Sequence, residues 1–202
     1  MQFGLSAVLL GLAAAGVSAD PTQTGPFNLL ITGTAKGSKI KGYGSACHAG
    51  AALEGLCYYT GPIAKDDISS QFYLNYTDNQ AVGPYQSGQL FWNLPFNGDQ
   101  VVAQPFYLGY SPSTNVAPAY FGFSDDYFAV GFDAKKSLFA VKYSDDSKNV
   151  PETRPAYTNP VPQYSWALCW QTTGGYYYHS IAWIQTGAPH NPTCEPVKIT
   201  KA

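Results

Sequence analysis

The fold of this chain is decided by one stretch near its C-terminal end, Trp166-Ala167-Leu168-Cys169-Trp170-Gln171-Thr172-Thr173-Gly174-Gly175-Tyr176-Tyr177-Tyr178-His179-Ser180-Ile181-Ala182-Trp183. Two adjacent glycines between two runs rich in aromatic residues are the signature of a tight two-residue turn. The stretch therefore predicts a β-hairpin, with strands over residues 164–172 and 176–185.

The turn also fixes which residues face one another. With the two glycines at the centre, one face carries the pairs Trp166 with Trp183, Leu168 with Ile181 and Trp170 with His179. The other face carries Ala167, Cys169 and Gln171 opposite Ala182, Ser180 and Tyr178. We expect the tryptophan face to be core. The alternative is that part of it forms an exposed aromatic platform for sugar rings.

Short strand signals recur along the rest of the chain, separated by turn clusters such as Pro95-Phe96-Asn97-Gly98-Asp99. We expect residues 20–26 to be a loose lead-in, residues 33–44 a hairpin or exposed loop, and residues 49–53 a single helical turn. Residues 151–162 read as an extended crossover. The remaining strands are predicted at residues 27–32, 70–75, 89–94, 101–107, 127–133, 138–143 and 196–200. About ten short strands predict an all-β protein, an antiparallel β-sandwich of jelly-roll type.

The N-terminal segment predicts secretion. Residues 1–19 contain an apolar run followed by Val17-Ser18-Ala19, which is typical of a signal peptide cleaved after Ala19. The run is too short to span a bilayer, so we expect no membrane anchoring. Residues 20–202 are expected to form a single secreted domain, located outside the cell or in the cell wall.

Secretion makes disulfides the default state of the four cysteines. Four cysteines allow three connectivities. We prefer Cys47–Cys57 and Cys169–Cys194, because each pair brackets a short, turn-rich segment that closes early. A ring of this size stabilises the fold by roughly 3 kcal/mol in the loop-entropy description. No two cysteines have the spacing of a zinc site, so no metal is expected at them.

Charge and composition exclude several kinds of partner. The net charge is −2, only 12% of residues are charged, and Arg154 is the single arginine. This is not the basic field that nucleic-acid binding needs. The sixteen tyrosines, part of an aromatic share of 15%, favour a β-rich extracellular protein.

Known catalytic patterns are missing from the sequence. It has no H-E-x-x-H and no G-x-S-x-G motif, and the adjacent Cys47 and His48 cannot easily form a thiol–imidazole pair. A glycosidase needs two carboxylates that face each other across a cleft, whereas the acidic pairs here are neighbours in sequence. We therefore assign no catalytic residue, no metal ligand and no cofactor, and the sequence leans against an enzyme.

Two surface features can be assigned to particular residues. Asn75-Tyr76-Thr77 is an N-glycosylation sequon, whereas Asn191-Pro192-Thr193 is blocked by its proline. Exposed tyrosine and tryptophan favour stacking on sugars and contact with proteins. The candidate ligand-contact aromatics are Tyr58, Tyr59, Trp92, Tyr176, Tyr177 and Tyr178.

Four segments carry a resemblance: Cys47-His48-Ala49-Gly50-Ala51-Ala52-Leu53-Glu54-Gly55-Leu56-Cys57, Trp92-Asn93-Leu94-Pro95, Ser180-Ile181-Ala182-Trp183 and Asn191-Pro192-Thr193-Cys194. In these the chain resembles a family of secreted ascomycete proteins with a domain of unknown function. The resemblance implies a filamentous fungus and secretion or cell-wall association. It implies no known activity and no functional residues.

Three functions remain open at this point. The leading hypothesis is a non-catalytic extracellular protein that associates with the cell wall and binds carbohydrate, with a wall polysaccharide or an extracellular protein as partner. The second is a secreted host-interaction protein, such as an effector or an allergen-like protein. The third is a polysaccharide-active hydrolase.

Overall fold

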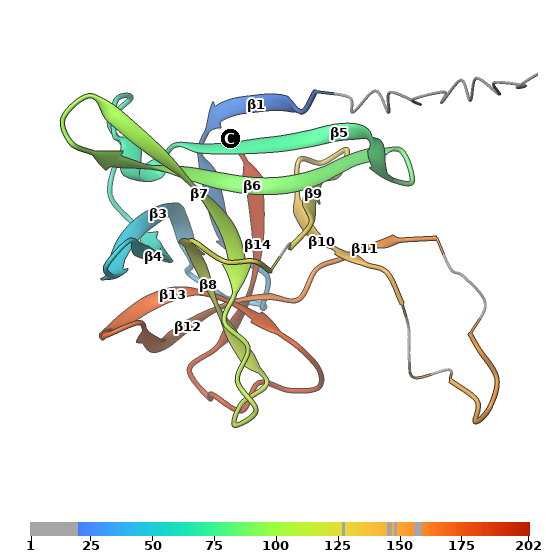
Figure 1. Ribbon diagram of the computed structural model, residues 1–202. Coiled ribbons are helices and arrows are strands. Elements are labelled where there is room, and N and C mark those ends of the chain that lie inside the picture. The colour runs from blue at the N-terminus through green and yellow to red at the C-terminus, as the bar shows by residue number, and fades with distance from the viewer. Residues whose placement is uncertain (1–19, 127, 145–146, 148, 156–158) are drawn as a thin grey trace, which may run out of the picture.

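A computed structural model describes residues 20–202 except 127, 145–146, 148 and 156–158 (Figure 1). The predicted signal peptide, residues 1–19, lies outside the described residues. The described part is all-β and antiparallel, with one short 3-10 turn, η1 (Ile68–Ser70). Its strands are β1 (Thr22–Phe27), β2 (Leu29–Gly33), β3 (Lys41–Gly50), β4 (Leu53–Tyr59), β5 (Phe72–Val82), β6 (Tyr85–Phe96), β7 (Gln100–Leu108), β8 (Val116–Gly122), β9 (Val130–Phe132), β10 (Leu138–Lys142), β11 (Val161–Gln163), β12 (Trp166–Thr173), β13 (Tyr176–Ile184) and β14 (Glu195–Lys201).

The strands form two layers, as in a sandwich. The first layer runs β1-β5-β6-β9-β10-β11 and lies at the top and right of Figure 1. The second runs β8-β13-β12-β14-β2-β3-β4, and β4 pairs back onto β8 and β13. That last pairing closes the second layer into a ring. Strand β7 joins the two layers, because its first part pairs with β6 and its last residues, Phe106–Leu108, pair with β8.

The β12–β13 hairpin has the predicted register. Trp166 lies opposite Trp183, Leu168 opposite Ile181 and Trp170 opposite His179, so the prediction is confirmed residue by residue. At the turn, Gly174 has a φ of 60°, and a Cβ there would collide with the carbonyl of Ala49. This position therefore requires glycine on two grounds.

One hydrophobic core fills the space between the layers. Trp166 and Trp183 are 2% and 6% exposed, and their rings meet edge to face at 4.7 Å. The indole nitrogen of Trp166 donates a hydrogen bond to the carbonyl of Leu138 in the other layer (2.8 Å). A smaller cluster, Val116, Ala167, Cys169 and Ala182, lies on the opposite face of the same hairpin.

Both preferred disulfides are present, Cys47–Cys57 and Cys169–Cys194. Cys47–Cys57 ties β3 to β4, and Cys169–Cys194 ties β12 to the loop that leads into β14. Cys194 lies on the outer face of the hairpin, where it packs against the small cluster.

The strand count was predicted too low, since the described part of the chain has fourteen strands rather than about ten. The expected loose lead-in contains β1, whose polar residues pair with β5 through their backbone, which no hydrophobic pattern reveals. β3, β4 and β8 were also missed. Part of the predicted crossover at 151–162 forms β11, while residues 156–158 lie outside the described part. The predicted helical turn at 49–53 is wrong. It is the β3–β4 turn, with Ala52 at a φ of 51°, because strand pairing and the disulfide override a weak helical preference.

We predict that Leu168→Ala lowers the free energy of unfolding by about 3 kcal/mol, because it leaves a cavity in a core that fully buries this side chain. Chemical denaturation measures the change. Thr172→Ala, at an exposed position of the same strand, is the matched control. A loss for Leu168→Ala no larger than the control's would contradict the assignment of this face to the core.

Candidate functional site

The β12–β13 hairpin extends beyond the core. β14 pairs with β12 only at Ala167 and Leu168, so the edge of β12 is unpaired nearer the turn, and Trp170 and Thr172 of this part are exposed. Trp170, Thr172, Tyr177 and His179 continue the tryptophan face of the register into this part. Trp170 is 47% exposed and Tyr177 is 63% exposed. One face of one hairpin is therefore core at one end and surface at the other.

Three rings on this face form a row that we call the aromatic platform: Trp170, Tyr177 and His179. Trp170 stacks on His179, with ring centres 4.8 Å apart and planes within 1° of parallel. It also stacks on Tyr177 at 5.8 Å and 22°. The ring of Tyr58, from β4, meets His179 edge-on at 5.4 Å. Stacking of this kind fixes the rings before any ligand arrives.

The platform is uncharged at neutral pH. Partial burial lowers the pKa of His179 below its ordinary value, and the nearby carboxylate of Glu195 offsets part of that effect. The imidazole is therefore neutral at pH 7. Its two neighbours in the row carry no charge.

A groove of about 640 Å³ adjoins the platform and shares Trp170 and Tyr177 with it. It runs between the hairpin and the loop that joins β7 to β8. None of its lining residues is Lys, Arg, Asp or Glu. They are Gly109, Tyr110, Ser111, Thr114, Val116, Pro118, Tyr120, Trp170, Gln171, Thr172, Tyr177 and Asn191.

Several hydroxyl groups of the site are open to a ligand. The hydroxyls of Tyr110, Thr172 and Tyr177 make no hydrogen bond within the part of the chain that the structure describes. Burial, with a smaller contribution from Asp126, raises the pKa of Tyr110, so its hydroxyl keeps its proton at neutral pH. The site therefore combines flat apolar rings with neutral donors and acceptors.

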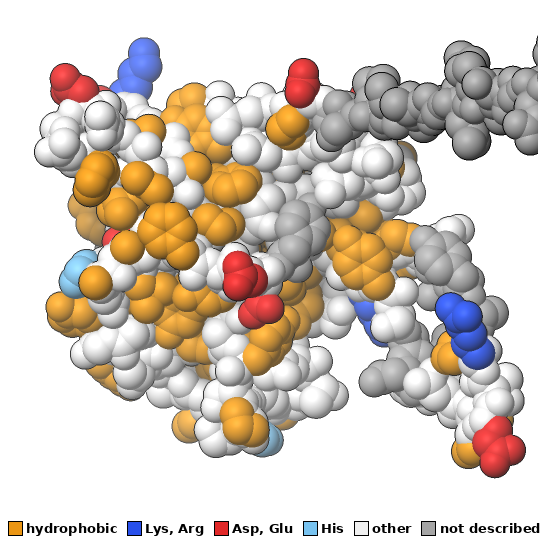
Figure 2. Space-filling view, in the orientation of Figure 1, with side chains coloured by type: hydrophobic (Ala, Val, Ile, Leu, Met, Phe, Trp, Pro, Cys, Tyr) orange, Lys and Arg blue, Asp and Glu red, His pale blue; other side chains and the backbone are white. Residues whose placement is uncertain are grey.

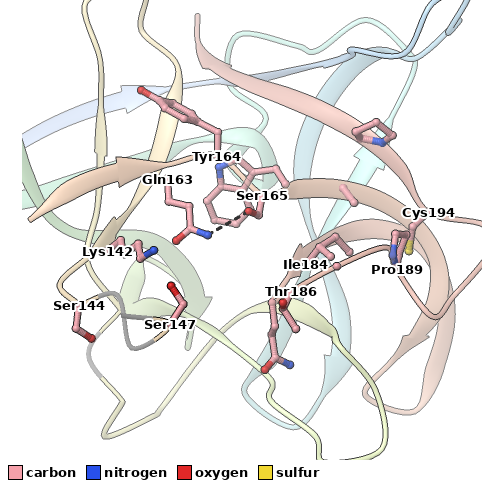
Figure 3. A pocket seen from close by; sticks show the side chains of 15 residues that line it. Lys142, Ser144, Ser147, Gln163, Tyr164, Ser165, Ile184, Thr186, Pro189 and Cys194 are labelled. Atoms are coloured by element: carbon pink, nitrogen blue, oxygen red, sulfur yellow. Dashed lines mark hydrogen bonds between the residues drawn. The ribbon is translucent and has the colours of Figure 1, made fainter. Parts of the chain in front are cut away.

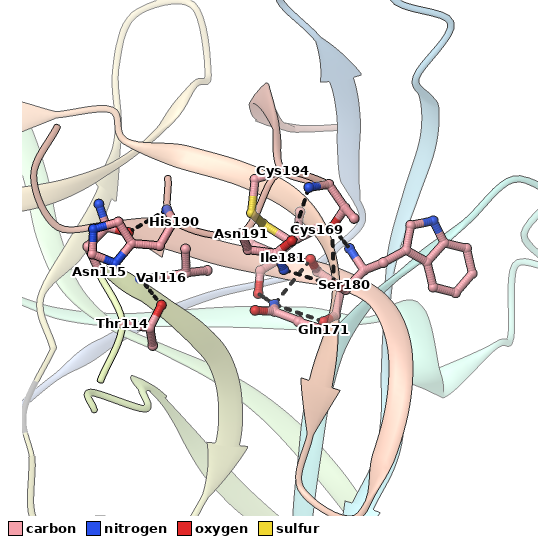
Figure 4. Close-up of a disulfide and its surroundings, with 12 residues drawn as sticks. Thr114, Asn115, Val116, Cys169, Gln171, Ser180, Ile181, His190, Asn191 and Cys194 are labelled. Carbon is pink, nitrogen blue, oxygen red and sulfur yellow. Dashed lines mark hydrogen bonds between the residues drawn. A yellow bond between two sulfur atoms is a disulfide. The ribbon is translucent and has the colours of Figure 1, made fainter. Parts of the chain in front are cut away.

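The backbone of Trp170 is held by the loop between β13 and β14 (Figure 4). Its N–H donates to the hydroxyl of Thr193 (3.0 Å), and its carbonyl accepts from Asn191 (2.9 Å) and Thr193 (3.2 Å). The Cys169–Cys194 disulfide joins the neighbouring residues of the same two segments. Asn191-Pro192-Thr193, which cannot be glycosylated, thus has a structural role.

Asn115 connects the two walls of the groove. Its side-chain amide donates to the carbonyls of Thr186 (2.6 Å) and Ala188 (2.7 Å), and its side-chain oxygen accepts from the N–H of His190 (2.9 Å). The end of the β7–β8 loop is thereby fixed to the β13–β14 loop.

The six predicted contact aromatics do not form one surface. Tyr177 belongs to the platform and Tyr58 touches it. Tyr176 and Tyr178 lie on the other face of the hairpin with His48, where the Tyr178 hydroxyl donates to the His48 carbonyl (3.1 Å). Tyr59 is exposed near the end of β4.

The prediction for Trp92 is wrong. Its side chain is only 5% exposed, and its indole nitrogen donates to the carbonyl of Ile68 (2.8 Å). Trp92 is therefore a core residue with a satisfied donor, and it leaves the set of candidate contacts.

Sequence reasoning did not select Trp170, His179, Tyr110 or Tyr120 as contact residues. Trp170 and His179 lie on the tryptophan face, which was expected to be core, with an exposed platform over part of it as the alternative. Alternation carries no information about where the core ends, and the structure buries Trp166 and Trp183 but exposes Trp170. One signal was available, the polar run Gln171-Thr172-Thr173 beside the turn. Tyr120 joins the groove through strand β8, which was not predicted, and Tyr110 through the loop that precedes β8.

A second hollow, of about 810 Å³, lies on the other side of the β13–β14 loop (Figure 3). Lys142, Ser144 and Ser147 line one side of it, and Trp166, Ala167 and Ile184 line another. Ser144 and Ser147 flank residues that lie outside the described part of the chain, so this hollow is not completely described. We build the site on the platform and groove, whose residues are all described.

No hollow described here brings two carboxylates together. The groove and the hollow of Figure 3 have no acidic lining residue among the described residues, and a third, beside η1, has only Asp99. Across residues 20–202, apart from the gaps given above, no group of His, Cys, Asp and Glu has the arrangement of a metal site. The same part of the chain has no helix long and apolar enough to cross a membrane.

No protein-family model matches the chain, and neither a curated protein nor a solved structure matches it significantly. The resemblance to secreted ascomycete proteins therefore stays a proposal.

We predict that Asn115→Ala destabilises the protein by about 2 kcal/mol, because three hydrogen bonds worth about 0.5–1.5 kcal/mol each are removed. Urea denaturation measures the change. Ser113→Ala, which removes a hydroxyl from the same loop, is the control. Equal stability of the two variants would show that Asn115 does not fix the loops.

Proposed function

We propose that this is a secreted, non-catalytic protein that binds a neutral polysaccharide, such as a component of a fungal cell wall, at the aromatic platform and groove. The observation that carries the proposal is the pre-stacked row Trp170, Tyr177 and His179 beside a groove with no charged lining residue. Secretion is supported by the two disulfides and by the predicted signal at residues 1–19.

The chemistry of the site suits an uncharged sugar chain. A pyranose ring presents an apolar face of C–H groups, which packs on an aromatic ring, and a rim of hydroxyls. The unpartnered hydroxyls of Tyr110, Thr172 and Tyr177 supply neutral hydrogen-bond partners for that rim. A carboxylated or sulfated polysaccharide would find no cation in the groove, so the site favours neutral glycans.

Apolar side chains also gather over much of the face shown in Figure 2, while charged ones are scattered and several stand at loop ends. This supports the alternative of a protein partner. Ile68, Phe96 and Val101 are each about half exposed near the β6–β7 turn, where Ile68 and Val101 line a small hollow of about 190 Å³. A host-interaction protein would use such a patch.

We predict that Trp170→Ala and Tyr177→Ala each weaken binding to an insoluble neutral glycan by about tenfold, the effect of losing about 1.4 kcal/mol of stacking. The measurement is depletion of the purified, secreted protein by chitin, β-1,3-glucan and cellulose, with albumin as the protein control. Tyr177→Phe keeps the ring and separates stacking from hydrogen bonding.

Phe96→Ala is the matched control, because it removes an aromatic ring that is equally exposed (54%) but lies at the β6–β7 turn. We expect it to bind like the wild type. Binding that survives both platform substitutions but is lost in Phe96→Ala would move the site to the apolar patch. Absence of binding to every glycan would favour the protein-partner alternative.

We also propose that Asn75 carries an N-linked glycan. Asn75 is half-buried in β5 between Gln23 of β1 and Gln89 of β6, and its side-chain oxygen is enclosed without a hydrogen-bond partner. The amide nitrogen is the atom that would carry the sugar. The structure thus places the sequon inside a strand rather than at a strand end.

For protein secreted from a eukaryotic host, we predict that peptide N-glycosidase reduces the mass by one glycan. Thr77→Ala should abolish this change, because it destroys the sequon and keeps Asn75. An unchanged mass of the wild-type protein after digestion would contradict the assignment.

A further inference from the structure

Two buried polar side chains, those of Glu54 and Gln104, lie together between the layers, and each has one oxygen without a hydrogen-bond partner among the described residues. Glu54, from β4, is 6% exposed, and Gln104, from β7, is fully buried. The amide of Gln104 donates to the carbonyl of Ala52 in the β3–β4 turn (3.1 Å). Glu54 Oε2 and Gln104 Oε1 have no hydrogen-bond partner. An ionised carboxylate and an amide oxygen are both acceptors, so they cannot satisfy each other.

A protonated Glu54 resolves this conflict, since its O–H can donate to Gln104 Oε1. Burial raises the pKa of Glu54, while the amide of Gln104 and the nearby His48 oppose the shift. Glu54 lies opposite His48 of β3 on one side and opposite the uncharged Phe121 of β8 on the other. The folded protein therefore holds this proton more tightly than the unfolded chain does. The contribution of Glu54 to stability is therefore complete below the ordinary pKa of 4.5 and is lost as pH rises through the raised value.

The β3–β4 turn beside Glu54 also braces the hairpin that carries the platform. The N–H of Gly175 donates to the carbonyl of Ala49 (3.1 Å), and the hydroxyl of Tyr178 donates to the carbonyl of His48. Gly55 of β4 packs so closely on Thr173 that a Cβ at this glycine would collide with it. The two hairpin tips therefore support each other.

We propose, resting on the carbohydrate-binding function above, that Glu54 is a protonation switch that makes glycan binding strongest in acid. With the proton in place, Glu54 and Gln104 hold the β3–β4 turn firmly against the hairpin. As pH rises, the carboxyl releases its proton to water, and the buried carboxylate can no longer donate a hydrogen bond to Gln104. The β3–β4 turn then packs less firmly against the hairpin that carries Trp170 and Tyr177. Glu54 is thus a positioning residue that touches no ligand.

The first test needs no ligand. The chain has three glutamates, Glu54, Glu152 and Glu195, so a carbon-13 NMR titration of their carboxyls gives three curves. We expect the Glu54 curve to have its midpoint above the ordinary value of 4.5. A Glu54 midpoint at or below 4.5 overturns the switch, whether or not the protein binds glycan.

The second test compares the wild type with Glu54→Gln, whose amide can donate to Gln104 Oε1 at any pH. Amide hydrogen exchange of residues 173–179 should be equal in the two proteins at about pH 4 and faster in the wild type at about pH 7.5, where only the wild type carries the charge. Glu152→Gln is the matched control on an exposed site. Equal exchange of wild type and Glu54→Gln at both pH values overturns the proposal.

The third test measures retention on the glycan that the wild type binds. We expect wild-type affinity to fall about fivefold or more between the same two pH values, the low end of typical coupling between sites, and Glu54→Gln to stay nearly constant. Titration of His179 changes the affinity of the wild type and of Glu54→Gln equally, so it does not contribute to the difference between them. A pH-dependence shared by both overturns the switch and leaves carbohydrate binding intact, whereas binding by neither at any pH defeats the proposed function alone.

Discussion

The register of the β12–β13 hairpin is the constraint on which the rest of the structure depends. Its two-glycine turn fixes every cross-strand pair, and one row of side chains then serves two purposes. Near the open end, Trp166 and Trp183 anchor the core between the layers. Near the turn, Trp170 and Tyr177 continue the same row at the surface. A shift of one residue would move all of these rings to the other face.

The surface part of the row is rigid because other segments support it. Asn191 and Thr193 hold the backbone of Trp170 on one side, where the Cys169–Cys194 disulfide fixes the loop. On the other side, the tip of β3–β4 packs against the turn. A rigid aromatic surface loses little conformational entropy when a ligand binds, which favours recognition of sugars that offer only weak individual contacts. The absence of charge in the groove lining is what favours a neutral glycan as the proposed ligand.

Local features of the sequence predicted the hairpin, its register, both disulfides and the all-β class, because a turn signal, alternation and short cysteine separations are local. The strands β1, β3, β4, β8 and β11 were not predicted: β1 is mostly polar and exposed, and β4 and β8 are largely buried runs without the alternation that marks a half-buried strand. The site was predicted only in part. Tyr177 was selected for its position in a tyrosine run. Trp92 was wrongly selected as exposed, and for Trp170 the core was preferred over the exposed alternative, because the depth of a residue depends on its tertiary surroundings.

The central claim is that sugar contacts the Trp170 end of the hairpin. The chain has four tryptophans, and Trp170 is exposed while Trp92, Trp166 and Trp183 are buried. The most direct measurement is therefore the NMR spectrum of the four indole N–H groups during titration with a soluble oligosaccharide of the glycan that the protein retains. The account predicts that the Trp170 resonance shifts and saturates with ligand while the other three stay in place. Saturable binding that leaves the Trp170 resonance unmoved would contradict it.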